Sequence, residues 1–273
     1  MSHDRAQTHI AWNGRIRPAG EVSVDARGDG WLYGLGCFET MGLAGGRVRF
    51  AEDHRERLRG AAAALGLAWP AGWEAFMSAV AELVRLDSCA DGVARLSFHA
   101  GPERVDWMAR VSPAGLMAGD APLSVGFSRF PHGGPSPLSR WKHNNYAANI
   151  LAFREARSAG RDEDLLCRGG RVVEGCLSTL WAVRGGAILT PPLEEGALAG
   201  VVRARLLRAG TANGLPVREQ ALTRGEILSA DSLYLSNAAM LVRPVGVLDG
   251  ALRPADADGA AALRAAVTGG ADG

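Results

Sequence analysis

The sequence almost lacks lysine. Of its 30 basic residues, Lys142 is the single lysine and the rest are arginine, although lysine is normally among the commonest residues of soluble proteins. Arginine forms salt bridges and covers apolar surface, but it keeps its proton near neutral pH and cannot attack a carbonyl. A primary amine can, so the composition singles out Lys142. The competing explanation is a coding bias toward arginine that spared one solvent-exposed lysine.

Cysteine pairs, excess charge and long apolar runs are also scarce. The four cysteines form no C-x-x-C pair, which argues against a zinc site or a disulfide framework and for small buried hydrophobic residues. A formal net charge of +1 provides no basic field for nucleic acid or an anionic membrane. No signal peptide core and no membrane-spanning run is present. We therefore expect a cytoplasmic protein without a metal site and without a nucleic-acid or membrane partner.

The length and hydrophobic pattern predict an α+β protein of two closely packed domains. At 273 residues, with 47% hydrophobic residues, the chain can bury a substantial core. We place a smaller N-terminal α+β domain at residues 1–118 and a larger strand-rich domain at 119–273. Small, turn-prone residues at 112–120 suit a crossing between them.

The first domain is expected to combine hairpins with two helices. Asn13-Gly14 tolerates the positive φ angles of a tight turn, and Gly45-Gly46 joins a second pair of strands. The expected segments are strands at 10–12, 15–17, 37–43, 48–50 and 93–99, and helices at 52–67 and 72–86.

The second domain is expected to bring Lys142 to the start of a helix at 144–159, after a Gly/Pro/Ser loop at 131–138. Loops held by a rigid scaffold often carry chemistry. The other expected strands are 123–130, 164–167, 171–174, 180–184, 187–190, 215–218 and 232–236. The other expected helices are 200–209, 224–229 and one after residue 250.

A lone reactive amine suggests Schiff-base chemistry, and with pyridoxal phosphate that chemistry needs two further groups. These are a cradle for the phosphate and a carboxylate facing the pyridine nitrogen. Glu174 ends a hydrophobic strand, where an unpaired carboxylate would be costly, so we expect it to have a cationic partner. Arg57 and the backbone amides of Val201 and Val202 at a helix start are candidates for the phosphate.

Five stretches together resemble the fold-type IV pyridoxal-phosphate enzymes, and they follow one another in the family's order along nearly the whole chain. The stretches are 33–40, 54–58, 142–146, 173–175 and 198–203. This family includes branched-chain and D-amino-acid aminotransferases and aminodeoxychorismate lyase. The resemblance implies a barrel-like C-terminal domain, pyridoxal 5'-phosphate as cofactor and a homodimer.

The resemblance also implies roles for individual residues. Lys142 becomes the Schiff-base lysine and Glu174 the partner of the pyridinium nitrogen. Arg57 and the amides of Val201 and Val202 become phosphate ligands.

Within the family, three features look most like the lyase: Lys142-His143, the segment 236–240 followed by 243–245, and Thr40. On that resemblance Thr40 is a candidate to assist proton transfer to the leaving group. Asn237 is a further candidate for cofactor or substrate binding. Relatives often carry an arginine with glycines where this chain has 98–102, so His99 is a tentative substrate-binding residue. Tyr146 is expected beside the cofactor.

The resulting hypothesis is a lyase that converts 4-amino-4-deoxychorismate to 4-aminobenzoate and pyruvate, for the synthesis of a folate precursor. The alternative of the same fold is a D-amino-acid or branched-chain aminotransferase. A third hypothesis is a protein that binds the cofactor without turnover.

Each residue also has a purely structural explanation. Glu174 could end its strand in a salt bridge, and Arg57 could lie on a solvated helix face. Thr40 suits a strand, Asn237 could cap the turn after its strand, and His99 could be a satisfied structural histidine.

Overall fold

A computed structural model describes residues 9–113 and 119–269, and the chain divides into two compact units. The first unit contains the described residues up to 113 together with Trp141–Asn145, and the second contains 119–140 and the residues from Tyr146 onward. Lys142, which the sequence predicts in the second domain, thus groups with the first unit. Most of the predicted crossing at 112–120 lies outside the described residues.

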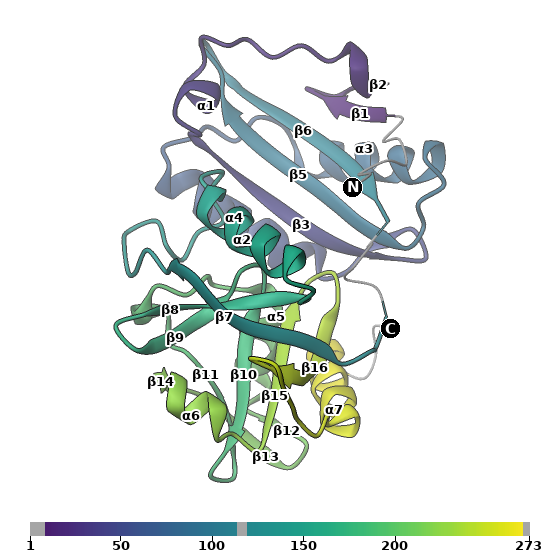
Figure 1. Ribbon diagram of the computed structural model, residues 1–273. Helices are drawn as coiled ribbons and strands as arrows, with labels where there is room; N and C mark the ends of the chain where they lie inside the picture. The colour runs from purple at the N-terminus through teal and green to yellow at the C-terminus, as the bar shows by residue number, and fades with distance from the viewer. Residues whose placement is uncertain (1–8, 114–118, 270–273) are drawn as a thin grey trace. The chain divides into compact units, whose positions relative to one another are not determined.

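The described strands of the first unit form a six-stranded antiparallel sheet, in the order β2-β1-β6-β5-β3-β4 (Figure 1). The elements are β1 (His9–Trp12), β2 (Arg15–Pro18), α1 (Asp29–Leu32), β3 (Gly36–Ala44), β4 (Arg47–Val48), α2 (Ala51–Ala64), α3 (Trp73–Leu86), β5 (Gly92–Ala100) and β6 (Val105–Ser112). The hairpin predicted at Asn13-Gly14 is confirmed, since both residues have the positive φ of a two-residue turn, 48° and 82°.

One face of this sheet carries the core of the unit. Because side chains alternate along a strand, Cys37, Met41 and Leu43 of β3 point to the face that α2 and α3 cover, and all three are buried. The helices contribute Leu58 and Phe76, which are fully buried. The opposite face carries the alternate residues of the same strands, and it holds the groups of interest for function.

The described strands of the second unit form an eleven-stranded sheet, in the order β12-β13-β11-β10-β15-β16-β7-β8-β9-β14 with β17 beside β16. Its strands are β7 (Leu123–Pro131), β8 (Glu163–Arg168), β9 (Arg171–Gly175), β10 (Thr179–Arg184), β11 (Ala187–Thr190), β12 (Thr211–Ala212), β13 (Leu215–Glu219), β14 (Leu222–Thr223), β15 (Ser232–Asn237), β16 (Leu241–Leu248) and β17 (Ala251–Leu252). Its helices are α4 (Ala147–Ser158), α5 (Val201–Ala209), α6 (Arg224–Leu228) and α7 (Ala257–Thr268).

The core of the second unit is built from large side chains with satisfied polar ends. Trp181 is fully buried and donates from Nε1 to Ser236 Oγ at 2.8 Å. Tyr234 is almost as buried and donates its hydroxyl to Asp256. Such hydrogen bonds offset the cost of burying the polar atoms of aromatic side chains.

The observed elements confirm the predicted α+β class and most of the predicted segments. Some boundaries were wrong. The helix expected from residue 144 begins at Ala147, because the segment before it pairs with β3, and the helix expected to run to residue 67 ends at Ala64. The strands β6 and β16 were not predicted, nor were the two-residue strands β12, β14 and β17. Three of the four cysteines are buried and all four are free, as expected for small hydrophobic residues.

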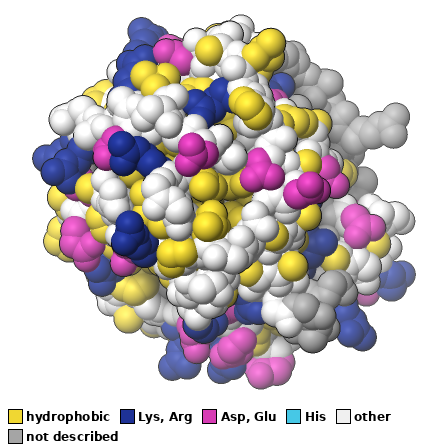
Figure 2. Space-filling view, turned by 90° about the horizontal axis from the view of Figure 1, so that it is seen from below, with side chains coloured by type: hydrophobic (Ala, Val, Ile, Leu, Met, Phe, Trp, Pro, Cys, Tyr) yellow, Lys and Arg dark blue, Asp and Glu magenta, His cyan; other side chains and the backbone are white. Residues whose placement is uncertain are grey.

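The surface mixes charges of both signs. On the face drawn in Figure 2, basic and acidic side chains are interspersed around apolar ones, so this face has no extended field of one sign. Among the helices in the described ranges, none combines the length and apolarity needed to cross a membrane.

Candidate active site

Lys142 lies on an extended segment that is hydrogen-bonded to the first residues of β3. Phe38 N donates to Lys142 O at 2.9 Å, and Asn144 N donates to Gly36 O at 2.9 Å. These bonds frame an antiparallel bridge between Cys37 and His143. The backbone of the lysine is therefore fixed by a strand of the first unit.

The close approach of this segment depends on glycine at position 36. A Cβ atom there would collide with the side-chain amide of Asn144 and with the carbonyl oxygen of Phe98. Asn144 uses its Nδ2 group to donate to Phe98 O at 3.2 Å, and the same group lies 3.2 Å from His99 Nδ1. Gly36 therefore permits the contact that anchors the lysine segment.

The amine of Lys142 lies against the open face of the sheet. Its Nζ atom is 4.6 Å from the centroid of the Phe38 ring. Thr40 follows two residues later on the same strand and so shares the face of Phe38. The structure thus brings a hydroxyl and the sole lysine to one face of β3, as the predicted roles of both residues require.

Arg57 is held by an acid that the sequence analysis missed. Its Nε and Nη2 atoms donate to Glu39 at 2.7 and 2.5 Å, and His54 Nδ1 lies 2.7 Å from the same carboxylate. Burial would raise the pKa of Glu39, but Arg57 and His54 outweigh it and hold that pKa at about 2. The predicted phosphate ligand is therefore part of a buried ionic cluster.

His99 lies on β5 on the open face, where it contacts Asn144 and stacks on Trp12 with ring centroids 6.4 Å apart. Burial lowers its pKa, and the positive charge of Arg95 acts in the same direction while Asp106 opposes them. A neutral imidazole is therefore favoured. These contacts give His99 a structural role, and its predicted substrate role stays a prediction.

Glu174 ends β9 in the second unit with its side chain buried. Its Oε2 atom accepts from Leu198 N at 2.9 Å, and His132 Nε2 lies 3.4 Å from Oε1. Gly134 N donates to His132 Nδ1 at 2.9 Å, so Nδ1 is an acceptor and the proton of a neutral ring resides on Nε2, facing Glu174. The neighbour of Glu174 within the described residues is thus a histidine with a fixed tautomer, and the cationic partner expected from the sequence stays a prediction.

A second buried carboxyl group lies near Glu174. Glu163 Oε1 accepts from Leu177 N at 2.6 Å and from Ser178 Oγ at 2.9 Å. Burial raises the pKa of Glu163 to about 7, although those two hydrogen bonds act in the opposite direction. The charge of Glu174 adds to the rise. Through its hydrogen bonds with Leu177 and Ser178, Glu163 therefore stabilises the turn that follows Glu174.

The start of α5 offers backbone donors for an anion. Val201 and Val202 are the first two residues of the helix, and Gly200 at its N-cap supplies no side-chain cap. The first amides of a helix have no acceptor within it, and they lie at the positive end of its dipole. The predicted phosphate-binding amides therefore occupy a helix start suited to that task.

Asn237 and Tyr146 have structural tasks in the second unit. Asn237 Oδ1 accepts from the backbone amides of Ala239 and Met240, each at 3.0 Å, which is the turn cap considered as its structural explanation. Tyr146 precedes α4 and its carbonyl oxygen accepts from Ile150 N at 2.9 Å. Their cofactor and substrate roles remain predictions.

The residues missed from the sequence are Glu39, His54, His132 and Glu163. A signal existed for the first two, because Glu39 interrupts an apolar strand face and His54 lies one helical turn before Arg57. No local signal pairs His132 with Glu174, which lies 42 residues away.

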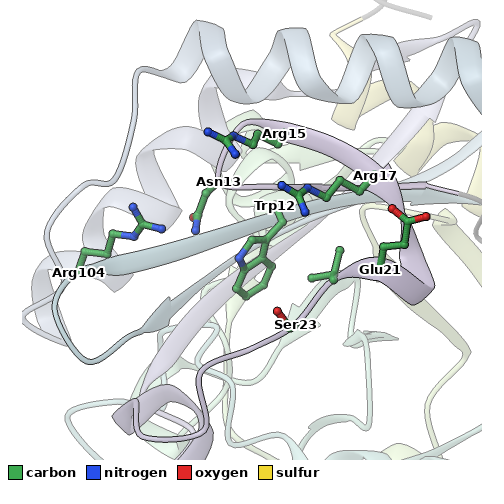
Figure 3. Close-up of a pocket in the computed structure, with 8 residues that line it drawn as sticks. Trp12, Asn13, Arg15, Arg17, Glu21, Ser23 and Arg104 are labelled. Atoms are coloured by element: carbon green, nitrogen blue, oxygen red, sulfur yellow. The ribbon is translucent and has the colours of Figure 1, made fainter.

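A pocket of about 410 Å³ lies at the β2 edge of the first unit (Figure 3). Trp12, Arg15 and Arg17 of the β1–β2 hairpin line it, together with Arg104 from the turn between β5 and β6. Arg104 is paired with Asp106 at 3.2 Å. None of the residues predicted to act in catalysis lines this pocket.

Each unit by itself contains groups that pyridoxal phosphate requires. The first unit supplies an amine that can bond an aldehyde, and the second supplies a buried carboxylate and a helix start for the phosphate. Each matches a distinct demand of that cofactor.

Comparison with known proteins supports this assignment. The family model described as amino-transferase class IV matches residues 36–248. The chain is 27% identical over 252 residues to the D-alanine aminotransferase of Bacillus licheniformis, and the alignment covers 88% of each chain. It is also 27% identical over 252 residues to the aminodeoxychorismate lyase of Bacillus subtilis, and that alignment covers 85% of this chain and 84% of the lyase.

Solved structures agree with the sequence relatives. The branched-chain aminotransferase of Thermoproteus uzoniensis, solved with norvaline, superposes with a TM-score of 0.85 and 26% identity, over 97% of this chain and 96% of that one. The class IV family uses pyridoxal phosphate, which confirms the predicted cofactor. The family model spans most of the chain and the superposition nearly all of it, so this protein belongs to the class IV aminotransferase family of fold-type IV pyridoxal-phosphate enzymes.

Proposed function

We propose that the protein is a lyase that converts 4-amino-4-deoxychorismate to 4-aminobenzoate and pyruvate, as a homodimer in the cytoplasm. The observation that carries the proposal is the position of Thr40 on the strand face where the Phe38 ring contacts Lys142. A hydroxyl beside the reactive amine can pass a proton to the oxygen of a departing enolpyruvyl group. The lyase of Bacillus subtilis among the relatives supports the same reaction.

The reaction breaks one carbon–hydrogen and one carbon–oxygen bond of the substrate. Pyridoxal phosphate, when bound, supplies a protonated ring that accepts the electrons of the first bond. Lys142 would hold the aldehyde of the cofactor, and its amine, when free, would take the proton from the nitrogen-bearing carbon of the substrate. Thr40 delivers a proton to the leaving oxygen, and the substrate ring becomes aromatic.

The remaining residues hold and tune the cofactor. Glu174 keeps a proton on the ring nitrogen, and His132 and Leu198 N orient its carboxylate. The amides of Val201 and Val202 bind the phosphate, and Arg57 adds a positive charge whose position Glu39 fixes. Asn237 and Tyr146 contribute contacts to the cofactor or substrate.

The homodimer is supported by an apolar patch on α1 and the residue after it. Trp31, Leu32 and Tyr33 are 68%, 55% and 72% exposed, and adjacent large apolar side chains at a surface often mark a protein interface. Sedimentation of the wild type and of Trp31→Ser checks this part of the proposal. We expect a dimer that the substitution weakens, and a monomeric wild type would refute it.

The second candidate is an aminotransferase on the same scaffold, supported by the D-alanine and branched-chain relatives. In that reaction Lys142 would move the proton from the nitrogen-bearing carbon of the substrate, and the cofactor would take up the amino group, which leaves a keto acid. No group leaves through a carbon–oxygen bond, so the hydroxyl of Thr40 would have no leaving oxygen to protonate.

The decisive experiment is incubation of the purified holoenzyme with aminodeoxychorismate and, separately, with a panel of D- and L-amino acids. We expect 4-aminobenzoate and pyruvate in equal amounts, and no keto acid from the panel. Accumulation of pyridoxamine phosphate and keto acids would reject the lyase assignment and support the aminotransferase assignment. An intact visible absorbance without any product would indicate a cofactor-binding protein.

A further inference from the structure

The pocket at the β2 edge contains groups that the proposed reaction does not use (Figure 3). In the hairpin register, Trp12 of β1 lies opposite Arg15 of β2, and directly opposed residues point to the same side of a sheet. Arg17 follows two residues after Arg15 and so returns to that side. Arg104 lines the same pocket from the turn between β5 and β6. A space of about 410 Å³, a size typical of small-molecule sites, therefore joins an aromatic ring to three arginines.

The wall around the ring is fixed before any ligand binds. Trp12 stacks on His99 with an interplanar angle of 29°. The next residue, Asn13, donates from its backbone N to Trp107 O at 2.9 Å, and Trp107 N donates to Asn13 Oδ1 at 2.9 Å. Asn13 Nδ2 also donates to Asp106 at 2.7 Å. These bonds hold the hairpin turn on β6, and a site that is already ordered loses less conformational entropy on binding.

The pocket carries an excess of positive charge. Arg15 and Arg17 are exposed and form no hydrogen bond or ion pair in the part of the chain that the structure describes. Arg104 uses Nε to donate to Asp106 at 3.2 Å, and its Nη atoms form no hydrogen bond with a described residue. Glu21 is the single acid among the described lining residues. Three guanidinium groups thus face one carboxylate, and an anion would balance the excess.

The positive groups lie on one side of the ring. Figure 3 shows the side chains of Arg17 and Arg104 on the side of the Trp12 indole that is away from Ser23. A ligand that covers the indole with a flat ring would therefore place a substituent at one end of that ring among the arginines.

We propose that this pocket is a second ligand site, which binds an aromatic carboxylate. The aromatic ring of the ligand stacks on Trp12, and its carboxylate accepts paired, charge-assisted hydrogen bonds from Arg15, Arg17 and Arg104. The site uses neither Lys142 nor a cofactor, so the inference is independent of the proposed function.

The first test compares three probes of similar size on the holoenzyme by ligand-observed NMR titration. Benzoate has both features of the ligand, benzamide lacks the charge, and cyclohexanecarboxylate lacks the flat ring. We expect benzoate to bind about 10-fold more tightly than benzamide and about 2- to 10-fold more tightly than cyclohexanecarboxylate. Equal affinity for the three probes, or no binding of benzoate, would overturn the proposal.

The second test places the probe in the pocket. The double variant Arg15→Gln/Arg17→Gln should weaken benzoate binding by about 10-fold and change benzamide binding by less than about 2-fold. Arg47→Gln, at an exposed arginine of β4, is the control and should change neither. Benzoate affinity that is unchanged in the double variant would place the binding elsewhere and refute the site.

A variant of the ring tests the stacking separately. Trp12→Leu should lower the affinity for benzoate to that for cyclohexanecarboxylate, because both probes then meet an aliphatic side chain. Wild-type preference for benzoate in Trp12→Leu would refute the role of the ring. If this variant does not fold, the double arginine variant, which changes exposed side chains, decides the proposal alone.

Turnover distinguishes two sources of the ligand, since 4-aminobenzoate is an aromatic carboxylate and the product of the proposed reaction. If the product is the ligand and regulates the enzyme, added 4-aminobenzoate should slow pyruvate release by the wild type but not by Arg15→Gln/Arg17→Gln. Equal inhibition of both, with benzoate binding lost in the double variant, would retain the site and assign it to another aromatic acid. Absence of pyruvate from the wild type would reject the lyase and leave the benzoate test unaffected.

Discussion

Arg57 and Glu39 form a bidentate pair in which Nε and Nη2 of the arginine donate to the two carboxylate oxygens at 2.7 and 2.5 Å. The side chains are 10% and 1% exposed. A buried pair holds its geometry more firmly than a surface pair. A phosphate at Arg57 would therefore meet a guanidinium whose orientation is already set, and Glu39 becomes a positioning residue in the proposed cofactor site.

Replacement of Glu39 by glutamine should destabilise the protein by about 3 kcal/mol at pH 7, because it leaves Arg57 buried without its charge partner. Urea unfolding measures the difference. Glu52→Gln is the matched control, since Glu52 is exposed and pairs with Arg55 at 3.3 Å, and it should cost less than about 1 kcal/mol. Equal stability of both variants would show that the buried pair adds nothing.

The same pair predicts a loss of stability in acid. The pKa of Glu39 is held at about 2, below its ordinary value of 4.5. Its contribution is therefore complete above pH 4.5 and is lost as the pH falls toward 2. Between pH 5 and pH 3 the wild type should lose more unfolding free energy than Glu39→Gln, and parallel curves would contradict this assignment.

Glu163 predicts the opposite pH dependence. Its pKa is raised from 4.5 to about 7, first by burial, so the protonated form stabilises the fold below pH 4.5 and this contribution is lost as the pH rises through 7. The shift corresponds to about 3 kcal/mol. Urea unfolding at pH 5 and pH 8 should show that loss in the wild type and a smaller one in Glu163→Gln. If the wild type is as stable at pH 8 as at pH 5, the raised pKa of Glu163 does not contribute to the stability of the fold.

Lys142→Ala should abolish the visible absorbance of the bound cofactor and the activity. Lys142→Arg should do the same, because it keeps the charge beside Phe38 but cannot bond an aldehyde. Borohydride reduction of the loaded wild type followed by peptide mass spectrometry should place the cofactor on Lys142. As a control, Arg47→Lys in the Lys142→Ala background supplies an exposed amine and should restore neither signal. Absorbance retained in Lys142→Ala would exclude the assignment.

Glu174→Gln should lower kcat by about 10²- to 10³-fold, because an amide cannot keep the ring nitrogen protonated. The absorbance of the linked cofactor should persist, since Lys142 is intact. Glu194, which is exposed, gives the control variant Glu194→Gln with wild-type kcat. Wild-type turnover in Glu174→Gln would remove Glu174 from the proposed mechanism.

Thr40→Val removes the hydroxyl and keeps the branched shape. We expect 4-aminobenzoate formation to fall by about 10²-fold or more, the usual contribution of a positioned proton donor. Thr211→Val, at an exposed position of β12, should leave the rate unchanged. A Thr40→Val enzyme with the wild-type rate would assign the proton transfer to another group.

Local patterns predicted the elements that local interactions determine. The Asn13-Gly14 turn and the helices α2 and α3 follow from turn chemistry and helical spacing. The missed strand β6 had a local signal. Its buried residues Trp107, Ala109 and Val111 alternate with less buried ones, which is the pattern of a strand with one face in the core. β16 was harder to predict because Pro244 lies within it.

Contacts between distant parts of the chain could not be predicted. The segment at Lys142 pairs with Gly36 and Phe38 across more than a hundred residues, and this pairing replaced the expected helix start. Likewise, an acid within an apolar strand predicts that some partner exists, but only the folded chain identifies Arg57 and His54 as the partners of Glu39.

The backbone pairing of the Lys142 segment with β3 has a consequence for expressing the two units as separate fragments. The polypeptide leaves the first unit before residue 119, returns for Trp141–Asn145 and leaves again at Tyr146. Cutting the chain after residue 118 would therefore put the reactive lysine on one fragment and the β3 template that shapes its backbone on the other. Neither half expressed alone should reproduce the lysine's native geometry, and mixing the two fragments would have to rebuild the bridge between Cys37 and His143 first.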